Sequence, residues 1–497
     1  MKKELLEEAL DLIHDEYLLE AAACKKRRFL PWIGSVAAVL ALIIVLQFLQ
    51  VPVALQAHAV VLAEAPRVES QPQIADYPDI ATWRAENEQW VRERKLLCLT
   101  TQAAAAQMEP FIFESFQTFL GDTQENQLFS PVNAYLGLAM TAELTGGETR
   151  QQLLDVLGTE DLEELRSHAS ALWEMIYMRT GNEVSYIRST HDGTSKHSGN
   201  AVIRTVAAHE ASTLANSLWL DETLDYNHRP MAALARHYYA SVYQQDLSDP
   251  QAVKDIQTWL NQNTGGLLTE DADNLQLPEE TLMALYSTLY FRSRWTDAFS
   301  EVSNTKGIFH GTAGDTVATF MNQHHYQTYY YFARDFGAVV LELKNGSKMW
   351  FFLPDEGKTV NDILDDQQYL DLLTAEDGQW GSRKYMLVNL SVPKFDILTT
   401  TDLRSGLEAM GITHLFDPAR ADFSPSLNTP ACLASAIQSI QVAVDEKGVT
   451  AAAYIALPTP GSAQPPKEII EFVLDRPFLF VITKDQIPLF AGVINQV

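Results

Sequence analysis

Cysteine is scarce in this chain of 497 residues: Cys24, Cys98 and Cys432 lie far apart and are odd in number. A disulfide framework is therefore not expected, and packing must supply the stability. Positive charge is scarce as well, because 36 Lys and Arg face 64 Asp and Glu and give a formal net charge of -28. Such a surface repels nucleic acid, so we expect an acidic soluble domain with no nucleic-acid partner.

Catalytic and metal-binding signatures are also missing. The chain has no G-x-S-x-G elbow, Walker loop, H-E-x-x-H helix or paired C-x-x-C, the main sequence routes to hydrolase, kinase or zinc chemistry. His324 and His325 are adjacent, so on a strand they point to opposite faces and share a metal ion only awkwardly. These absences favour a protein that is not an enzyme and that uses no cofactor or metal, since a membrane-tethered hydrolase would require a nucleophile and a base that no motif supplies.

One apolar run near the N-terminus predicts a membrane anchor. No residue is charged from Phe29 to Leu46, and the run continues past two glutamines to Leu55, longer than the roughly 20 residues that span a bilayer. The basic block 25–28 precedes it, which favours a cytoplasmic N-terminus and an external remainder. A cleaved signal peptide ending near AHA (57–59) is the alternative, but the long polar start and long apolar run favour an anchor. The anchor also resembles those of some Gram-positive bacterial membrane proteins.

The rest of the chain divides by composition. Residues 56–105 are polar and mixed and include ESQPQIADYPD, which predicts an extracellular linker. Beyond them helical spacings are mixed with strand-like runs such as MWFFL (349–353), without an internal repeat, so we predict an α+β domain whose sheet is covered by helices. The predicted order is a cytoplasmic segment 1–28, a transmembrane anchor 29–55 in the lipid bilayer, a linker 56–105 and one domain 106–497.

Blocks of sequence along the whole of this domain resemble, in order, those of the serpin family. They are NQLFSPVNAYLGLAMTAELTGGETRQQLLDVLG (126–158), ANSLWL (215–220), TLMALYSTLYFRSRWTDAF (281–299), VPKF (392–395), LRSGLEAMGITHLFDPARADFS (403–424) and FVLDRPFLFVI (472–482). The resemblance implies a serpin fold: a large mixed central β-sheet, further sheets, about eight or nine helices and an exposed reactive loop near the C-terminus. Residues 180–205 are longer than the family's usual connection and predict a surface loop.

The family has a polar cluster that controls the opening of its central sheet, usually two serines, an asparagine and a histidine. The matching positions here are Ser130, Asn133, Ser287 and Gln438, so a glutamine stands where the family has histidine and the hydrogen bonds must be arranged differently. Trp295 matches the family's tryptophan at the top of the sheet, although an ordinary core aromatic explains it equally well.

The stretch VAVDEKGVTAAAYIALPTPGSAQPP (442–466) joins two patterns. Alternate positions from Val449 are apolar, as one buried strand face requires, whereas prolines and glycine from Pro458 onward predict an exposed loop. The resemblance implies a hinge followed by a bait that, once cut by a protease, inserts its strand half into the main sheet. The implied hinge residues are Glu446, Gly448, Val449, Thr450, Ala451, Ala452 and Ala453, small and uncharged from the glycine onward.

The bait also indicates a class of target. Counting forward from Glu446 places the cleaved bond at Ser462–Ala463, and counting back from RPF places it several residues later. No residue between Gly448 and Pro466 is charged, so elastase-like or subtilisin-like serine proteases, with shallow apolar pockets, are favoured over trypsin-like ones. The resemblance implies a suicide substrate that traps the protease as a covalent acyl-enzyme, here as a monomer on the outer face of the cell membrane.

Two features of the bait argue the other way. Pro458 and Pro460 each remove a backbone donor from the part that inserts last, and Tyr454 is bulkier than the residue the family often has there. The alternative is therefore a non-inhibitory serpin that acts as a cell-surface binding module.

Overall fold

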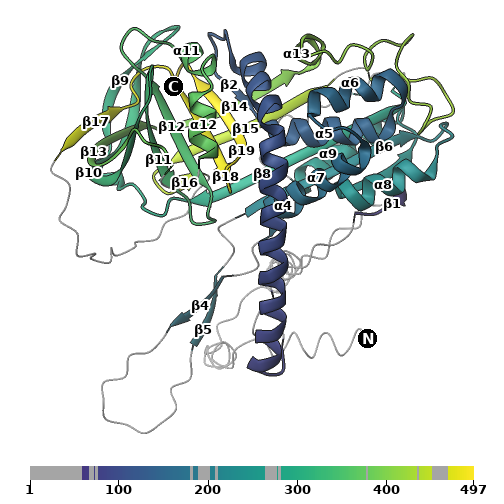
Figure 1. The fold of residues 1–497 in the computed structure, drawn as a ribbon, viewed down its shortest axis with the longest axis horizontal. Helices are drawn as coiled ribbons and strands as arrows, with labels where there is room; N and C mark the ends of the chain where they lie inside the picture. Colours follow the sequence, from purple (N-terminus) through teal and green to yellow (C-terminus); the bar gives the residue numbers. More distant parts are fainter. Residues whose placement is uncertain are drawn as a thin grey trace, which may run out of the picture. The chain divides into compact units, whose positions relative to one another are not determined.

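The computed structural model describes residues 59–65, 72, 77–179, 183–187, 202–206, 211–263, 277, 281–375, 379–433, 436–449 and 468–497. The predicted segments 1–28 and 29–55 lie outside these residues. Within the described ranges, no helix is both long enough and apolar enough to cross a membrane. Residues 58–497 form one compact unit, built on two large sheets with helices around them (Figure 1).

The first sheet is mixed, as predicted. Its strands β6 and β7 run parallel, and its other paired neighbours run antiparallel. The strand order is β1 (Val60–Ala63), β7 (Ala240–Gln245), β6 (Ala211–Asp221), β8 (Met283–Arg294), β16 (Gly448–Val449), β15 (Ile437–Asp445) and β14 (Phe395–Asp402), with β3 (Met178–Arg179) paired to β6. This sheet contains Gly448 and Val449 of the predicted hinge.

The second sheet contributes many aromatic side chains to the core. Its strands β18 and β19 are buried at every position, which is why they read as continuous apolar runs rather than alternating ones. The strand order is β17 (Ile469–Val473), β13 (Arg383–Pro393), β10 (Gly314–Phe332), β11 (Phe336–Glu342), β12 (Lys348–Pro354), β18 (Phe478–Lys484), β19 (Ile487–Ile494) and β2 (Gln127–Phe129), with β9 (Thr305–Gly311) paired to β10. His324 and His325 form a bulge in β10, between Gln323 and Tyr326.

Helices cover both sheets, with α5 to α9 gathered at the first sheet and α11 and α12 at the second (Figure 1). Their bounds are α4 (Ile80–Leu120), α5 (Pro131–Leu144), α6 (Gly147–Leu157), α7 (Leu162–Ile176), α8 (His228–Tyr238), α9 (Pro250–Asn263), the 3-10 helix η2 (Glu301–Ser303), α11 (Val360–Leu364), α12 (Gln368–Thr374) and α13 (Arg404–Ala409). Helix α5 contacts β8 of the first sheet and β19 of the second. It therefore lies where the two sheets meet.

Two predicted surface segments contain regular structure. Within the predicted linker 56–105, β1 joins the edge of the first sheet beside β7, and α4 begins at Ile80 behind the cap Asp79. The linker prediction missed this helix because its first half is rich in polar helix formers and has no apolar stripe. Within the predicted loop 180–205, β4 (Glu183–Ile187) pairs with β5 (Val202–Val206), whose last residue lies just beyond that range.

Candidate functional site

The start of the predicted hinge is already part of the first sheet. Gly448 and Val449 form the short strand β16, which pairs antiparallel with β15 on one side and with β8 on the other. Val449 lies beside Val444 of β15 and Ser293 of β8. Since both flanking strands run antiparallel to β16, they run parallel to each other. The hinge therefore enters the sheet between two strands that have the same direction.

Gly448 fits this position because it has no side chain. A Cβ at residue 448 would lie 2.3 Å from the Ser293 carbonyl oxygen and 2.5 Å from the Arg294 Cα, so any other residue would collide with the backbone of β8. Its φ of 156° lies in the region that favours glycine. Asp445 shapes the preceding turn, since its Oδ1 accepts hydrogen bonds from the backbone N–H groups of Lys447 (2.8 Å) and Gly448 (3.2 Å).

Glu446 is a buried charged anchor at the start of the hinge. Its side chain accepts hydrogen bonds from the Nζ of Lys394, at 3.0 Å to one carboxylate oxygen and 2.9 Å to the other, and from the amide of Asn304. Burial raises the pKa of the Glu446 carboxyl, but the bonds from Lys394 and Asn304 outweigh burial and hold that pKa below its ordinary value. The ionised carboxylate is therefore the form that this site stabilises.

Trp295 binds the hinge through its backbone and its ring, and it is only 1% exposed. Its indole Nε1–H donates to the Asp445 carbonyl at 2.8 Å, and its backbone N–H donates to the Lys447 carbonyl at 3.0 Å. Its ring packs edge-on against Phe299, whose backbone N–H donates to the Glu446 carbonyl at 3.0 Å. The residue is thus both a core aromatic and a contact of the hinge.

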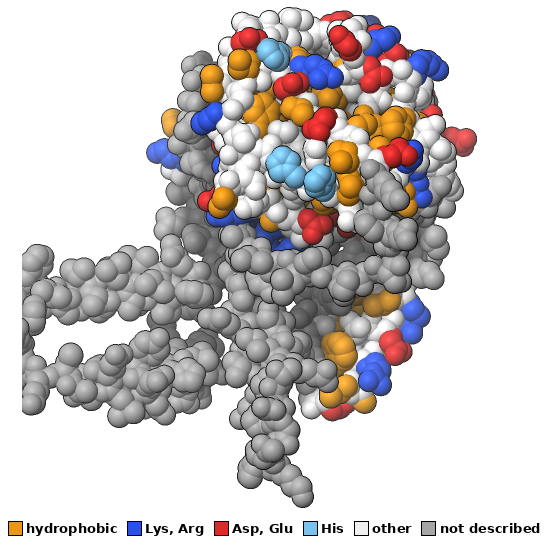
Figure 2. Space-filling model, turned by 90° about the vertical axis from the view of Figure 1, so that its left-hand side faces the viewer, with side chains coloured by type: hydrophobic (Ala, Val, Ile, Leu, Met, Phe, Trp, Pro, Cys, Tyr) orange, Lys and Arg blue, Asp and Glu red, His pale blue; other side chains and the backbone are white. Residues whose placement is uncertain are grey.

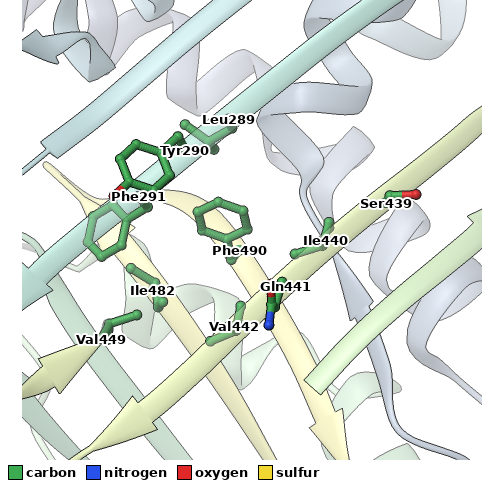
Figure 3. Close-up of a pocket in the computed structure, with 10 residues that line it drawn as sticks. All are labelled: Leu289, Tyr290, Phe291, Ser439, Ile440, Gln441, Val442, Val449, Ile482 and Phe490. Carbon is green, nitrogen blue, oxygen red and sulfur yellow. The ribbon is translucent and has the colours of Figure 1, made fainter. Parts of the chain in front are cut away.

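A cleft continues the line of β16 between β8 and β15 (Figure 3). No ladder joins these two strands directly, although each is described over its whole length. The cleft has about 420 Å³ of empty space, counting its open mouth. Strands β8 and β15 form its two sides, the second sheet forms its floor, and Val449 closes one end. The residues that line it are Leu289, Tyr290 and Phe291 of β8, Ser439, Ile440, Gln441 and Val442 of β15, Ile482 and Phe490 of the second sheet, and Val449.

The predicted polar cluster holds both sides of this cleft to the start of α5. Asn133 is tied to β8: its Nδ2 donates to the Ser287 carbonyl at 3.1 Å, and the Ser287 hydroxyl donates to its Oδ1. Ser130, the N-cap of α5, is tied to β15. Its N–H donates to Gln438 Oε1 at 3.0 Å, and Gln438 Nε2 donates back to its carbonyl at 3.1 Å. We call these four residues the clasp.

The structure thus brings together Glu446, Gly448, Val449, Trp295 and the clasp around one cleft. The other predicted residues of the hinge and bait lie outside the described residues: Thr450, Ala451, Ala452, Ala453, Ser462 and Ala463. The sequence reasoning missed Lys394 and Asn304 as partners of Glu446. Lys394 lies within the VPKF block, but nothing local indicates a contact with a residue 52 positions away.

Comparison with known proteins agrees with this geometry. Residues 106–497 match the model of the family described as Serpin (serine protease inhibitor). Among relatives, bovine (Bos taurus) plasminogen activator inhibitor 1 is 28% identical over 391 residues, which cover 76% of this chain and 89% of that protein. Serpin-ZX of Arabidopsis thaliana is 26% identical over 385 residues, covering 74% and 91%. The native state of tengpin, a thermophilic serpin, has the same fold, with a TM-score of 0.67, 24% identity and coverage of 89% of this chain and all of that one.

Proposed function

Because the chain belongs to the serpin family of protease inhibitors, which are not enzymes, we propose that it is a single-use trap for a serine protease. The observation that carries the proposal is the position of β16 between β8 and β15, at the closed end of an empty cleft. A protease that cuts the bait as an acyl-enzyme frees the hinge side of the loop. The loop then enters the cleft as a strand and carries the bound protease away before water can release it.

The register of β16 supports the insertion step, because continuing it would give each residue from Thr450 to Ala456 a partner on both β15 and β8. The residues that follow Val449 at steps of two face inward, and the first of them, Ala451 and Ala453, reach the apolar part of the cleft. Ile455 then reaches the level of the clasp. The three positions and their neighbours on β15 and β8 are Ala451 between Val442 and Phe291, Ala453 between Ile440 and Leu289, and Ile455 between Gln438 and Ser287.

The same register also answers most of the objection that Pro458 and Pro460 lack the backbone donor that an inserted strand needs. Pro458 would fall beside residue 435 of the chain, whereas β15 begins only at Ile437. Both prolines therefore lie beyond the part of the ladder in which a backbone donor is needed on the β15 side. Tyr454 falls on the outward face, where its bulk does not enter the cleft. Insertion from Thr450 to Ala456 meets neither obstacle.

We test the trap by mixing the full-length chain in detergent with pancreatic elastase, subtilisin and trypsin in separate reactions. Denaturing gels and mass spectrometry then follow the products. We expect a complex with elastase or subtilisin that survives denaturation and a released peptide that begins at or within a few residues of Ala463, because the bait is uncharged. Clean cleavage near Ser462 with no complex, and no gain in thermal stability, would reject the trap and favour a cell-surface binding module.

We also propose that the trap is a monomer displayed on the outer face of a membrane by residues 29–55. The support is the uncharged run and the basic block that precedes it. In cells that express the full chain, the protein should stay in the membrane fraction after alkaline carbonate washing, and an added protease should reach its C-terminal domain. A chain that lacks residues 1–55 should be soluble. Release of the full chain by carbonate would contradict the anchor.

A further inference from the structure

An aromatic and cationic patch lies on the outer face of the second sheet, on strands that lead to the end of the bait. Tyr329 of β10 and Tyr385 of β13 are direct cross-strand partners, with their ring centroids 5.2 Å apart. The Arg383 guanidinium lies over the Tyr329 ring, 4.2 Å from its centroid. On the next strand, Ile469 of β17 is the partner of Leu387. We call Tyr329, Arg383, Tyr385 and Ile469 the aromatic patch.

These side chains face solvent. Tyr329, Tyr385 and Ile469 are 38%, 46% and 52% exposed, whereas Met386 and Val388, on the opposite face of β13, are buried. Figure 2 shows the side of the molecule that carries β9, β10, β13 and β17, with hydrophobic side chains spread across it. Among the described residues Arg383 has no carboxylate within salt-bridge distance. A folded surface that exposes two tyrosines and a stacked arginine has the composition of a binding hot spot.

The patch is continuous with the C-terminal end of the bait. Glu468, the first described residue after the bait, accepts a hydrogen bond from the Leu387 backbone N–H at 2.9 Å and forms an ion pair with Lys384. Glu468 lies five positions after Ala463, which is at most about 18 Å of extended chain. A protease domain of roughly 240 residues is about 45 Å across. A protease seated on the proposed bond therefore reaches the aromatic patch.

We propose that the aromatic patch is a second contact surface for the target protease, next to the bait and on its C-terminal side. This inference rests on the trap function proposed above. The partner it fits is a serine protease that carries a surface carboxylate and apolar side chains beside the part of its cleft that holds residues C-terminal to the cleaved bond. Arg383 receives the carboxylate, and because its guanidinium is already ordered on Tyr329, it loses little freedom on binding. Tyr385 and Ile469 contact the apolar side chains.

The test measures the second-order rate constant of covalent complex formation for the full-length chain and three variants, with pancreatic elastase and subtilisin. Tyr385→Ala removes an aromatic contact, and Arg383→Glu reverses the charge. Arg404→Glu is the matched control, because Arg404 also lies over an aromatic ring, Phe416, but on α13, next to the end of β15 remote from the hinge. A synthetic peptide of residues 449–468 reports cleavage of the bait without the sheet.

We expect Tyr385→Ala to slow complex formation about tenfold with at least one protease, as hot-spot truncations do. Arg383→Glu should slow it at least as much at low salt and less at 0.5 M salt, because rim charges act mainly on association. The rate constant of Arg404→Glu should stay within twofold of that of the unaltered chain. The order in which the proteases cleave the peptide should differ from the order of their rates of complex formation. The proposal would be overturned if the rate constants of all variants lay within twofold of that of the unaltered chain. It would also be overturned if every variant that forms the complex more slowly also had a lower melting temperature.

Two other outcomes also reject the proposal. If the unaltered chain forms no complex with either protease, the trap function fails and the aromatic patch loses its partner. If the unaltered chain forms a dimer that Tyr385→Ala abolishes while all rates stay the same, the patch is a surface for a second copy instead. Sedimentation at two protein concentrations separates this outcome from the proposed one.

Discussion

Val449→Asp should expel the hinge from the sheet. The Val449 side chain is 2% exposed and shares its cleft with Phe291, Val442 and Ile482. Losing the buried valine costs about 1.5–3 kcal/mol. A carboxylate in its place would lie in a cleft whose lining residues include no cation, which costs several kcal/mol more. The two-residue ladder of β16 has only a few hydrogen bonds, at about 0.5–1.5 kcal/mol each, so it cannot hold the charge in place.

Limited trypsin digestion measures this directly at Lys447. In the native chain the Lys447 carbonyl accepts a hydrogen bond from the Trp295 backbone and the next residue is locked in β16, so cleavage there should be slow. In Val449→Asp the bond should be cut rapidly, and mass spectrometry should find a new N-terminus at Gly448. The same variant should be cleaved by elastase as a substrate, without a covalent complex.

The matched control is Val302→Asp, because Val302 is 96% exposed and lies in η2, next to Asn304. It should change stability by less than about 0.5 kcal/mol and leave Lys447 protected. If Val449→Asp keeps both the protection at Lys447 and the normal yield of complex, our reasoning about the buried hinge is wrong.

Three further predictions concern the same region. Because the pKa of Glu446 is held low, its contribution to hinge stability is complete above the ordinary value of 4.5 and is lost as pH falls through the lower folded value. Hydrogen exchange at β16 should therefore separate Glu446→Gln from the native chain at pH 7 and by progressively less as the pH is lowered below 4.5, and Lys394→Met should behave likewise. Gly448→Ala should raise cleavage at Lys447 more than tenfold through its clash with β8, and unchanged protection would contradict the close approach of residue 448 to the β8 backbone. The pair Ala453→Cys and Leu289→Cys should form a disulfide only after the bait is cut, because the register then makes them neighbours; bonding in the uncut chain, or none after cleavage, would refute that register.

The sequence predicts well those parts that a local pattern specifies. Gln438, Ile440 and Val442 stand at alternate positions of β15, and the structure buries all three, as one face of a strand requires. The unbroken apolar runs of β18 and β19 correspond to strands buried on both faces. The clasp residues, found by their match to a family pattern, lie together where α5, β8 and β15 meet.

What the sequence could not predict depends on distant contacts. The pair between Lys394 and Glu446 and the bond from Asn304 join parts of the chain that share no local pattern. The close approach of Gly448 to β8 is likewise a contact between distant parts of the chain that no local pattern indicates. The first half of α4 was missed for a different reason, since a helix without an apolar face lacks the 3.6-residue signal.

The position of Gly448 also explains why the bait pattern has to begin where it does. Side chains alternate along a strand, so a slip of one residue would turn Thr450, Ala452 and Tyr454 into the cleft and turn the apolar set outward. Only a residue without a Cβ fits against the Ser293 carbonyl. The glycine therefore fixes the register with which the residues after it pair with β8. From that point insertion meets two alanines in the apolar cleft and then an isoleucine at the clasp, before the first proline lies past the end of β15. The glycine thus sets the register on which the proposed trap depends.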